Sequence, residues 1–357
     1  MKVVILSDNK PGHYKQSLGI VEKMPKCQME WLEIQFRAKW RDNLLRIFMC
    51  IFGGIPLSVS FTQTLLRLSL AAETYNSVLQ IRDADIVLST GSSVAAVNLL
   101  FGKILHAKTV TCRRPSPVGI RHFDLAILPM LSWEKAKAKG RDNVCKTIGV
   151  PNPISPDILN AERTQLLQKL NLPDSPRIGI LVGGTDQHET ITIEDAEHLS
   201  KICKTVVQKM NAQISVTTSR RTPLDVTEQL KSQLESTDWC LLFIEPDTTS
   251  ELDDPYQAIL ALSDILIVTA DSFSMVCEAA SSERKVIILS LSEKRRRQPK
   301  RYKVYEYMEQ HSIVSRCTLD GLSQQIDKAL ASNCNSSTPL RDTEKAADAI
   351  RTLIDKK

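Results

Sequence analysis

Small hydroxyl side chains and a carboxylate follow directly on an apolar run in the last third of the sequence. The run at 265–269 is short and rich in β-branched residues, as expected for a buried parallel strand. The next residues, Ala270-Asp271-Ser272-Phe273-Ser274-Met275-Val276, lead into a segment of helical composition. In open α/β sheets ligands bind at the carboxyl ends of strands, and helix N-terminal amides favour phosphate. The junction therefore indicates either a phosphate site or an ordinary turn in which Ser272 caps the helix.

Two other strand ends in the second half carry residues suited to a diphosphate. Two glycines after the strand expected at 177–182 let the backbone approach a ligand closely. Two arginines after the strand expected at 213–218 offer guanidinium forks that match phosphate oxygens. Glycine and small polar residues are also common in ordinary turns, because they suit the backbone conformation there. A nucleotide site is therefore indicated by the presence of such residues at several strand ends of one sheet. The expected phosphate partners are Gly183, Gly184, Thr185, Ser219, Arg220, Arg221, Ser272, Phe273, Ser274 and Met275.

Glu278 is the carboxylate expected to accept hydrogen bonds from a ribose, and the alternative is a solvated helix glutamate. Asp271, seven residues earlier, is expected to shape the turn, because hydroxyls and amides are better phosphate partners than a carboxylate. No G-x-G-x-x-G follows a strand and no G-x-x-x-x-G-K-[ST] occurs in the sequence. Neither a dehydrogenase nor a P-loop kinase is therefore expected.

In the first half, Asp8 and His13 follow the first strand across a Pro-Gly turn. Both are candidate general bases, since the ordinary pKa of histidine, about 6.5, suits proton removal from a hydroxyl group. The alternative is that the two side chains merely cap the next helix. Polar residues of this turn, and of the turn after the strand expected at 86–90, are predicted on the acceptor side: Lys10, Gly12, Gln16 and Ser92.

The composition is that of a globular protein of two domains. The chain has 357 residues, 42% of them apolar, and a formal net charge of +5, which does not by itself imply nucleic acid. Nine cysteines are scattered without a C-x-x-C pair, which argues against a disulfide framework and a structural zinc site. The N-terminus reads as a strand rather than a signal peptide. No metal and no nucleic-acid partner are expected, and a reduced cytosolic compartment fits best.

Two segments are candidates for contact with a membrane or an anionic ligand. The first is the apolar stretch 44–70, whose most membrane-like part, 47–61, is interrupted by two glycines and a proline and is too short and too broken to span a bilayer. The stretch 44–70 has Arg41, Arg46 and Arg67 on its flanks, and it either docks on an anionic membrane, holds a lipid-linked acceptor, or forms a pair of core helices. The basic run at 294–303 either extends a positive field toward an anionic substrate or is a solvated loop.

Alternation of strands and helices in both halves predicts an α/β protein with two Rossmann-like, doubly wound parallel-sheet domains that face a central cleft. Three prolines between 148 and 156 mark the linker. The expected domains are 1–150 on the acceptor side, 151–340 for the nucleotide, and a C-terminal helix in 341–357 that packs back on the first domain. Strands are expected at 3–7, 29–36, 86–90, 108–112, 125–128, 177–182, 213–218, 239–244, 265–269 and 286–290. Helices are expected at 15–23, 63–82, 93–105, 193–210, 223–236, 255–262, 272–281, 302–310, 321–332 and 343–355.

Four motifs, in this order and over nearly the whole chain, resemble the mitochondrial fission (elongated mitochondria) family. They are 8–17, Gly183-Gly184, 218–223 and 270–279. That family is in turn similar to glycosyltransferases of the GT-B type, in which the C-terminal of two Rossmann-like domains binds the sugar nucleotide. The similarity implies a base at the position of His13 and a ribose partner at that of Glu278.

The function expected from the resemblance is transfer of a sugar from a nucleotide-sugar donor, an NDP-sugar, to a hydroxyl of a membrane-linked or glycan acceptor. No tightly bound cofactor is expected. The protein is expected in the cytoplasm or peripherally on the inner face of the cytoplasmic membrane. The alternatives are a non-catalytic membrane-associated scaffold of the same family type and a GT-B-like epimerase or phosphorylase.

Overall fold

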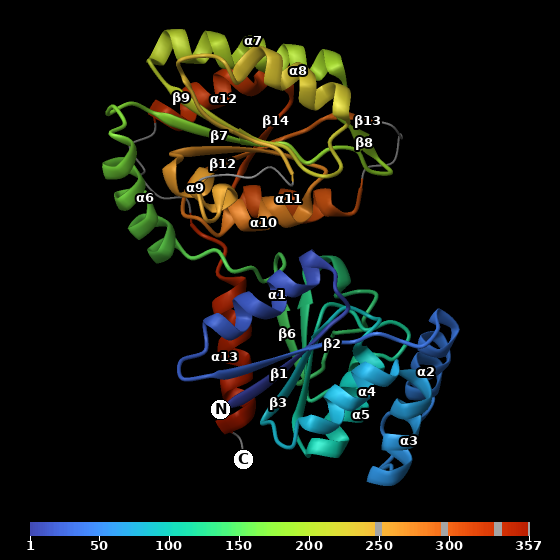
Figure 1. The fold of residues 1–357 in the computed structure, drawn as a ribbon. Helices are drawn as coiled ribbons and strands as arrows, with labels where there is room; N and C mark the ends of the chain where they lie inside the picture. Colours follow the sequence, from blue (N-terminus) through green and yellow to red (C-terminus); the bar gives the residue numbers. More distant parts are fainter. Residues whose placement is uncertain (247–251, 294–298, 332–337, 356–357) are drawn as a thin grey trace. The chain divides into compact units, whose positions relative to one another are not determined.

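The chain forms two compact units, each a parallel sheet between layers of helices (Figure 1). The computed structural model describes residues 1–246, 252–293, 299–331 and 338–355. Unit 1 comprises Met1–Pro153 together with Arg341–Lys357, and unit 2 comprises Ile154–Leu340. Among the described residues, no helix combines the length and the apolar composition needed to cross a bilayer.

Unit 1 is built on a six-stranded parallel sheet in the order β2-β1-β3-β4-β5-β6. Helices α1 and α13 cover one face of the sheet and α2 to α5 cover the other (Figure 1). Every residue of β3 and β5 is buried, because both faces of a parallel sheet are covered. The strands are β1 (Lys2–Ser7), β2 (Gln28–Glu33), β3 (Ile86–Thr90), β4 (Lys108–Cys112), β5 (Leu125–Pro129) and β6 (Val144–Thr147). The helices are α1 (Pro11–Glu22), α2 (Lys39–Phe52), α3 (Val59–Ser69), α4 (Ala72–Gln80), α5 (Ala95–Leu105) and α13 (Asp342–Asp355).

Unit 2 has a second six-stranded parallel sheet, in the order β10-β9-β7-β11-β12-β14. The strands are β7 (Arg177–Leu181), β9 (Gln213–Thr217), β10 (Cys240–Ile244), β11 (Ile265–Thr269), β12 (Lys285–Leu289) and β14 (Ser315–Cys317), with β8 (Glu189–Thr190) and β13 (Ser292–Glu293) as a separate antiparallel pair. The helices are α6 (Pro156–Leu170), α7 (Ile193–Met210), α8 (Leu224–Leu234), α9 (Pro255–Leu262), α10 (Phe273–Ala280), α11 (Arg301–Gln310) and α12 (Leu319–Ala331).

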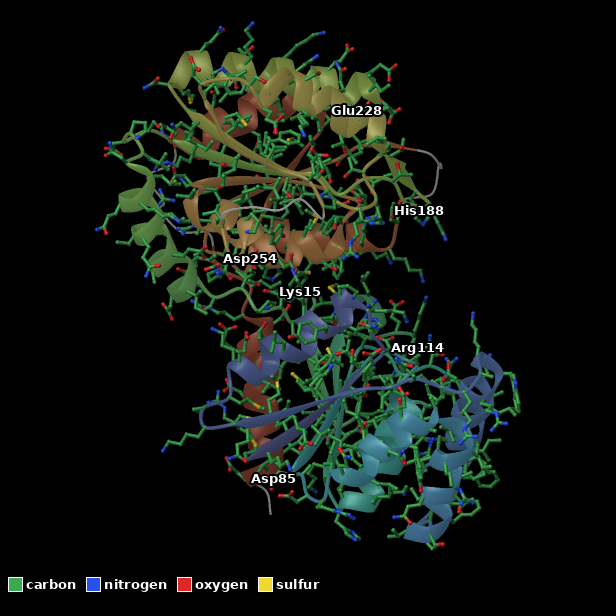
Figure 2. The ribbon with its side chains drawn as sticks, in the orientation of Figure 1. Lys15, Asp85, Arg114, His188, Glu228 and Asp254 are labelled. Carbon is green, nitrogen blue, oxygen red and sulfur yellow. The ribbon has the colours of Figure 1, made fainter. Side chains whose placement is uncertain are left out.

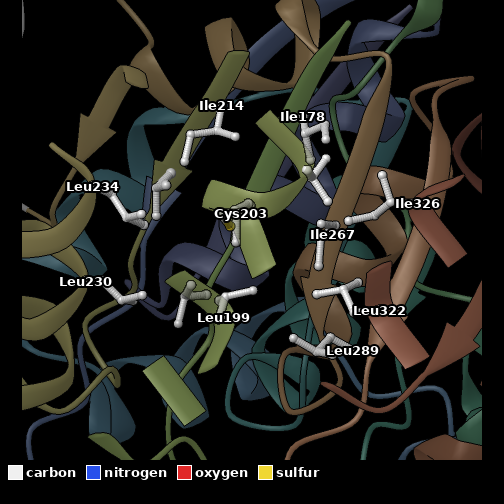
Figure 3. Close-up of a cluster of buried hydrophobic side chains, with 14 of the residues drawn as sticks. Ile178, Leu199, Cys203, Ile214, Leu230, Leu234, Ile267, Leu289, Leu322 and Ile326 are labelled. Atoms are coloured by element: carbon white, nitrogen blue, oxygen red, sulfur yellow. The ribbon is translucent and has the colours of Figure 1, made fainter. Parts of the chain in front are cut away.

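The core of unit 2 lies between this sheet and helices α7, α8 and α12. Figure 3 shows Ile178 and Ile267 of the strands beside Leu199, Leu230 and Leu322 of the three helices. Helices α9 and α10 pack on β7 and on β11 with β12, respectively. The tight packing of this layered core keeps the strand ends in fixed positions.

In each sheet, the chain first adds strands on one side of the first strand and then adds the remaining strands on its other side. In unit 1 it runs from β1 to β2 and returns to place β3 on the other side of β1. In unit 2 it runs from β7 through β9 to β10 and returns to place β11 on the other side of β7. The loops at the carboxyl ends of β1 and β3, and those of β7 and β11, therefore diverge, and ligands of open α/β sheets bind at such places. The predicted site residues that follow β1, β7 and β11 therefore lie at the switch points of the two sheets.

The prediction of a single helix at 63–82 is wrong. Leu70 has extended backbone (φ −85°, ψ 153°) and separates α3 from α4. Leu70 forms an antiparallel β-bridge with Phe36. This bridge explains the break, because a residue in extended conformation cannot continue the helix. The patterns place α2 only within the alternative of two core helices at 44–70, and they do not predict α6, β6 and β14. The last two are short edge strands whose assignment depends on the neighbouring strand.

Candidate functional site

An aspartate and a histidine form a pair at the carboxyl end of β1, at the switch point of unit 1. Nδ1 of His13 lies 2.9 and 3.0 Å from the two carboxylate oxygens of Asp8. Because the carboxylate only accepts, Nδ1 of the neutral ring carries the proton and Nε2 keeps its lone pair. The same relation orients the histidine of hydrolytic triads. The pair can thus remove a proton through Nε2 of His13.

The carboxylate of Asp8 is held by two further donors. The hydroxyl of Ser93 donates at 2.6 Å and the ammonium of Lys10 at 2.8 Å, and the Asp8 side chain is 7% exposed. Burial raises the pKa of Asp8, but hydrogen bonds from His13, Lys10 and Ser93 outweigh burial and hold the pKa well below the ordinary aspartate value. Neither side chain of the pair caps α1, whose N-cap residue Lys10 makes no side-chain cap bond. The helix-capping alternative is therefore wrong.

The ring of His13 is seated on glycine backbone. Gly91 has a φ of +94°, and a Cβ there would lie 2.5 Å from Cε1 of His13. On the other side, a guanidinium nitrogen of Arg113 lies 3.3 Å from Nε2 of His13. Because a guanidinium only donates, Arg113 donates to the Nε2 lone pair here, and an acceptor hydroxyl must displace it to reach that nitrogen. Ser93 and Arg113 are functional candidates that no sequence pattern singles out, although each lies in a polar turn that follows a strand.

Among the residues expected on the acceptor side, Lys10 contacts the Asp8–His13 pair, whereas Gln16 and Ser92 bond to backbone carbonyls. Gln16 is buried and donates to the carbonyl of Gly12 at 2.7 Å, and Ser92 donates to the carbonyl of Arg114 at 3.3 Å. Figure 2 shows Arg114 at the carboxyl edge of this sheet and Asp85 at the opposite edge. Gln16 therefore bonds within the start of α1, and Ser92 joins the turn after β3 to the turn after β4.

A pocket of about 400 Å³ opens beside the same turn. Tyr14 and Trp31 meet edge to face in it, with ring centroids 4.5 Å apart. Its lining is Ser7, Asn9, Lys10, Pro11, Tyr14, Met29 and Trp31. Its aromatic walls suit a ligand with apolar faces, and Lys10, which pairs with Asp8, is the lining residue that connects it to the pair.

In unit 2, Asp271 connects three loops at the switch point. Its Oδ1 accepts from the hydroxyl of Thr269 at 2.7 Å, and that hydroxyl oxygen accepts from the amide of Gly183 at 2.7 Å. Its Oδ2 lies 3.0 Å from Arg221, an ion pair without hydrogen-bond alignment. Burial raises the pKa of Asp271, and Thr269 and Arg221 oppose that rise. A Cβ on Gly183 would lie 2.4 Å from Oδ1, so the carboxylate shapes the loops from beneath.

The glycine loop and the arginine loop are joined backbone to backbone. Gly184 has a φ of +137°, where a Cβ would lie 2.2 Å from the carbonyl oxygen of Arg221, and the amide of Thr185 donates to that oxygen at 3.1 Å. The hydroxyl of Ser219 accepts from the amide of Arg221 at 3.1 Å. Arg220 is exposed and makes no hydrogen bond or ion pair within the described part of the chain. Of the two arginines, Arg220 is thus the one available to a ligand.

The N-terminus of α10 presents backbone amides that have no backbone acceptor among the described residues. Ser272 is the N-cap residue, and its side chain makes no cap hydrogen bond. The amides of Phe273, Ser274 and Met275 have no carbonyl within the helix to bond. Phe273 stacks on Tyr305, with ring centroids 6.0 Å apart. The turn therefore offers amides and hydroxyls at a place suited to an anion.

Glu278 lies one turn along α10 from Ser274, on the same face. It is buried, and its Oε2 accepts a hydrogen bond from the hydroxyl of Tyr256 at 2.7 Å. Burial together with this carboxylate raises the pKa of Tyr256 well above the ordinary tyrosine value. The alternative of a solvated helix glutamate is therefore wrong.

Arg301 supports the α10 turn in a way that the sequence did not predict. It lies in the basic run, yet its guanidinium pairs with Asp186 at 2.6 Å and also with Glu189, and it donates to the carbonyl of Ala270 at 2.8 Å. Two carboxylates neutralise its charge, so Arg301 does not extend a positive field. Residues 294–298 of the run lie outside the described part.

Each Rossmann-like unit thus carries its own candidate site at its switch point: the Asp8–His13 pair in unit 1 and the turn at the start of α10 in unit 2. Within the described residues, no group of three or more His, Cys, Asp or Glu side chains is placed to hold a metal ion. The chain belongs to the mitochondrial fission ELM1 family, whose sequence model matches residues 11–354. An uncharacterized protein of Rickettsia prowazekii (strain Madrid E) is 22% identical over 316 residues, which are 81% of this chain and 83% of that protein.

Solved structures confirm the fold class. The UDP-GlcNAc 2-epimerase of Methanocaldococcus jannaschii aligns with a TM-score of 0.57 at 12% identity, over 99% of both chains. The UDP-GlcNAc 2-epimerase of Neisseria meningitidis, in a structure with bound UDP-GlcNAc, aligns with a TM-score of 0.56 at 13% identity, over 99% of this chain and 100% of that chain. Because the identities are only 12% and 13%, the likeness establishes the GT-B-type fold alone.

Proposed function

We propose that the protein is a glycosyltransferase that moves a sugar from a nucleotide-sugar donor to an acceptor hydroxyl. The observation that carries the proposal is the Asp8–His13 pair, because it leaves a basic ring nitrogen at a switch point. The fold supports it, since two solved structures of this fold come from proteins named for a nucleotide-sugar substrate.

In the proposed reaction His13 removes the proton of the acceptor hydroxyl through Nε2. The acceptor oxygen then bonds to the anomeric carbon of the sugar, the bond from that carbon to the diphosphate oxygen breaks, and the nucleoside diphosphate leaves. Asp8 stays ionised and stabilises the imidazolium that forms, as in hydrolytic triads. Asp8 is thus a positioning residue, and His13 is the base.

The donor is proposed to bind unit 2. The amides at the start of α10, with the hydroxyls of Ser272 and Ser274, would stabilise the charge of the leaving diphosphate, and Arg220 would add a guanidinium. Glu278, held by Tyr256, would accept a hydrogen bond from the ribose. Asp271 keeps the supporting loops in place and has no contact of its own with the donor.

The acceptor is proposed to be a membrane-linked molecule or a glycan, and the protein to act at the inner face of the cytoplasmic membrane. Lys10 donates to Asp8 and lines the aromatic pocket, whose walls suit an acceptor with apolar faces. This part of the proposal rests on the residues of unit 1 alone.

A nucleotide-sugar epimerase is the second candidate, favoured by the names of the two solved structures. It would alter the donor sugar without any acceptor, so analysis of products formed in the absence of acceptor separates it from a transferase. A non-catalytic scaffold, the other alternative, would bind no nucleotide sugar.

The test is calorimetry of the protein with UDP-, GDP-, ADP-, TDP- and CMP-sugars. We expect binding of at least one, and an Arg220→Ala variant with affinity lowered by about tenfold or more, since a hydrogen bond to a charged group contributes about 1.5–3 kcal/mol. Arg82→Ala is the matched control, because Arg82 is exposed at the amino end of β3. Absence of binding to the whole panel contradicts the proposal, and equal affinities of the two variants refute the role of Arg220.

A further inference from the structure

Helix α2 exposes an apolar stripe on its outer face. Trp40, Leu44, Ile47 and Ile51 are spaced four, three and four residues apart, which places them along one side of a helix. They are 57%, 56%, 53% and 62% exposed. The opposite side of α2 buries its own apolar residues, such as Met49, in the core of unit 1. The stripe is therefore not needed for packing of α2 on the sheet.

The stripe continues onto α3. An apolar groove of about 540 Å³ runs between the two helices and includes Leu65 and Leu68 of α3. Of the 16 large apolar side chains that are exposed within the described residues, nine lie between residues 40 and 68. So dense a cluster marks an interaction surface rather than the scattered apolar residues of an ordinary surface. We call residues 39–69 the α2–α3 face.

Positive charge surrounds the α2–α3 face. Between residues 34 and 72 the one carboxylate is Asp42, which is buried and accepts a hydrogen bond from Arg46 at 3.0 Å. Lys39 and Arg67 are exposed at its two ends. The face thus offers a partner apolar side chains and cations but no exposed carboxylate.

A basic pocket of about 340 Å³ adjoins the end of α2. Cys50 of α2 lines the pocket, and its carbonyl accepts a hydrogen bond from Arg121 at 3.1 Å. No acidic residue lines the pocket, and its five cations are Arg114, Arg121, Lys135, Lys137 and Arg141. Five cations around one hollow are suited to phosphate groups.

We propose that the α2–α3 face and the basic pocket dock the protein on a bilayer that contains anionic phospholipid. The apolar stripe enters the boundary between headgroups and acyl chains, where tryptophan is favoured, and the pocket cations contact lipid phosphates. A second copy of this chain fits less well, because two such faces would bring their cations together. The inference rests on the membrane side of the proposed function, but it needs no sugar transfer.

The experiment is co-flotation of the full chain, without nucleotide sugar, with vesicles of phosphatidylcholine alone or mixed with phosphatidylglycerol. We expect binding to the mixed vesicles, weakened by salt. Ile47→Ser/Ile51→Ser should lower the partition into mixed vesicles by about tenfold or more, because the buried part of two large apolar side chains is lost. Lys135→Glu/Lys137→Glu should also lower it by about tenfold or more, at about fivefold for each cation.

The matched control is Ile158→Ser/Leu224→Ser, which removes two exposed apolar side chains (51% and 71%) from α6 and α8 of unit 2. It should bind vesicles like the unaltered protein. The proposal is overturned if the unaltered protein does not float with mixed vesicles, or if both double serine variants bind equally. It is also overturned if Ile47→Ser/Ile51→Ser abolishes a dimer in sedimentation while vesicle binding persists, since the face would then join two copies. Failure of flotation leaves nucleotide-sugar binding in calorimetry untouched, so the two proposals fail separately.

Discussion

At the scale of single residues, the site depends on how each charge is balanced. Asp8 is ionised because three donors surround it, and His13 is oriented by that carboxylate. In unit 2, Arg301 and Arg221 are already neutralised by carboxylates, whereas Arg220 is not. Residue type alone therefore does not show which arginine can bind a phosphate.

Replacement of Asp8 by asparagine should lower stability in a pH-dependent way. The pKa of Asp8 lies below its unfolded-state value of about 3.9, so its contribution is present above that pH and is lost as the pH falls through the folded-state pKa. We expect Asp8→Asn to lower the free energy of unfolding near neutral pH by about 2 kcal/mol. The variant should therefore unfold at a lower temperature than the unaltered protein. The gap to the unaltered protein should shrink in acid.

Thermal melts at a series of pH values measure this difference. Asp83→Asn is the control, because Asp83 is largely exposed and its ion pair with Lys2 is a surface contact of small effect. A gap that stays constant into acid would show that Asp8 acts through packing and not through its charge.

At the scale of elements, the candidate donor site depends on close contact between loop backbones. The loop after β7 passes so near the loop after β9 that Gly184 has no room for a side chain. Arg301, at the start of α11, and Tyr305 within it both donate to the carbonyl of Ala270 after β11. The turn at the start of α10 is therefore positioned by a neighbouring loop and a neighbouring helix.

Gly184→Ala should destabilise unit 2 by roughly 2–4 kcal/mol, since the new Cβ meets a carbonyl oxygen and the backbone is in a glycine region. Denaturant unfolding measures the loss. Gly321→Ala in α12 is the matched control: a Cβ there would lie 3.6 Å from its nearest neighbour, so the change should be neutral or stabilising. Equal effects of the two substitutions would contradict the close approach at Gly184.

At the scale of the whole molecule, the two ends of the chain belong to one unit. Asp342, at the start of α13, accepts from the amides of Ile148 and Gly149 at 3.0 and 2.6 Å. The hydroxyl of Thr343 donates to the carbonyl of Asn152 at 2.8 Å. Unit 1 is thus completed only by residues that follow unit 2 in the chain.

Removal of residues 341–357 should therefore destabilise unit 1 and leave unit 2 intact. Helix α13 buries Ala346, Ala347 and Ile350 against the sheet, and their exposure costs several kcal/mol, at about 25 cal/mol per Å². Hydrogen exchange read by mass spectrometry should show lost protection in β1 and β6 and unchanged protection in β7 and β11. Equal loss in both units would show that they do not unfold separately.

Strong hydrophobic patterns predicted many elements to the residue. The strands predicted at 86–90 and 108–112 and the helices predicted at 193–210 and 255–262 have those bounds in the structure. These elements contain enough buried apolar residues of their own to be recognised from the sequence. The pattern is weaker for α2, which is apolar on two sides, and for β14, a three-residue edge strand.

The sequence by itself determined the fold class, the family, and the motifs that carry chemistry, because strand ends, glycines and hydroxyls are encoded within a few neighbouring residues. The tertiary structure alone decided which partners they meet. Ser93 lies 85 residues from Asp8, Arg113 lies 100 from His13, and Arg301 lies 115 from Asp186. Contacts over such separations arise from strand order in a sheet, which no local pattern records. The exposure of the α2–α3 face was also decided by the tertiary structure. Because α2 is apolar on two sides, only its packing on the sheet determines which side remains exposed.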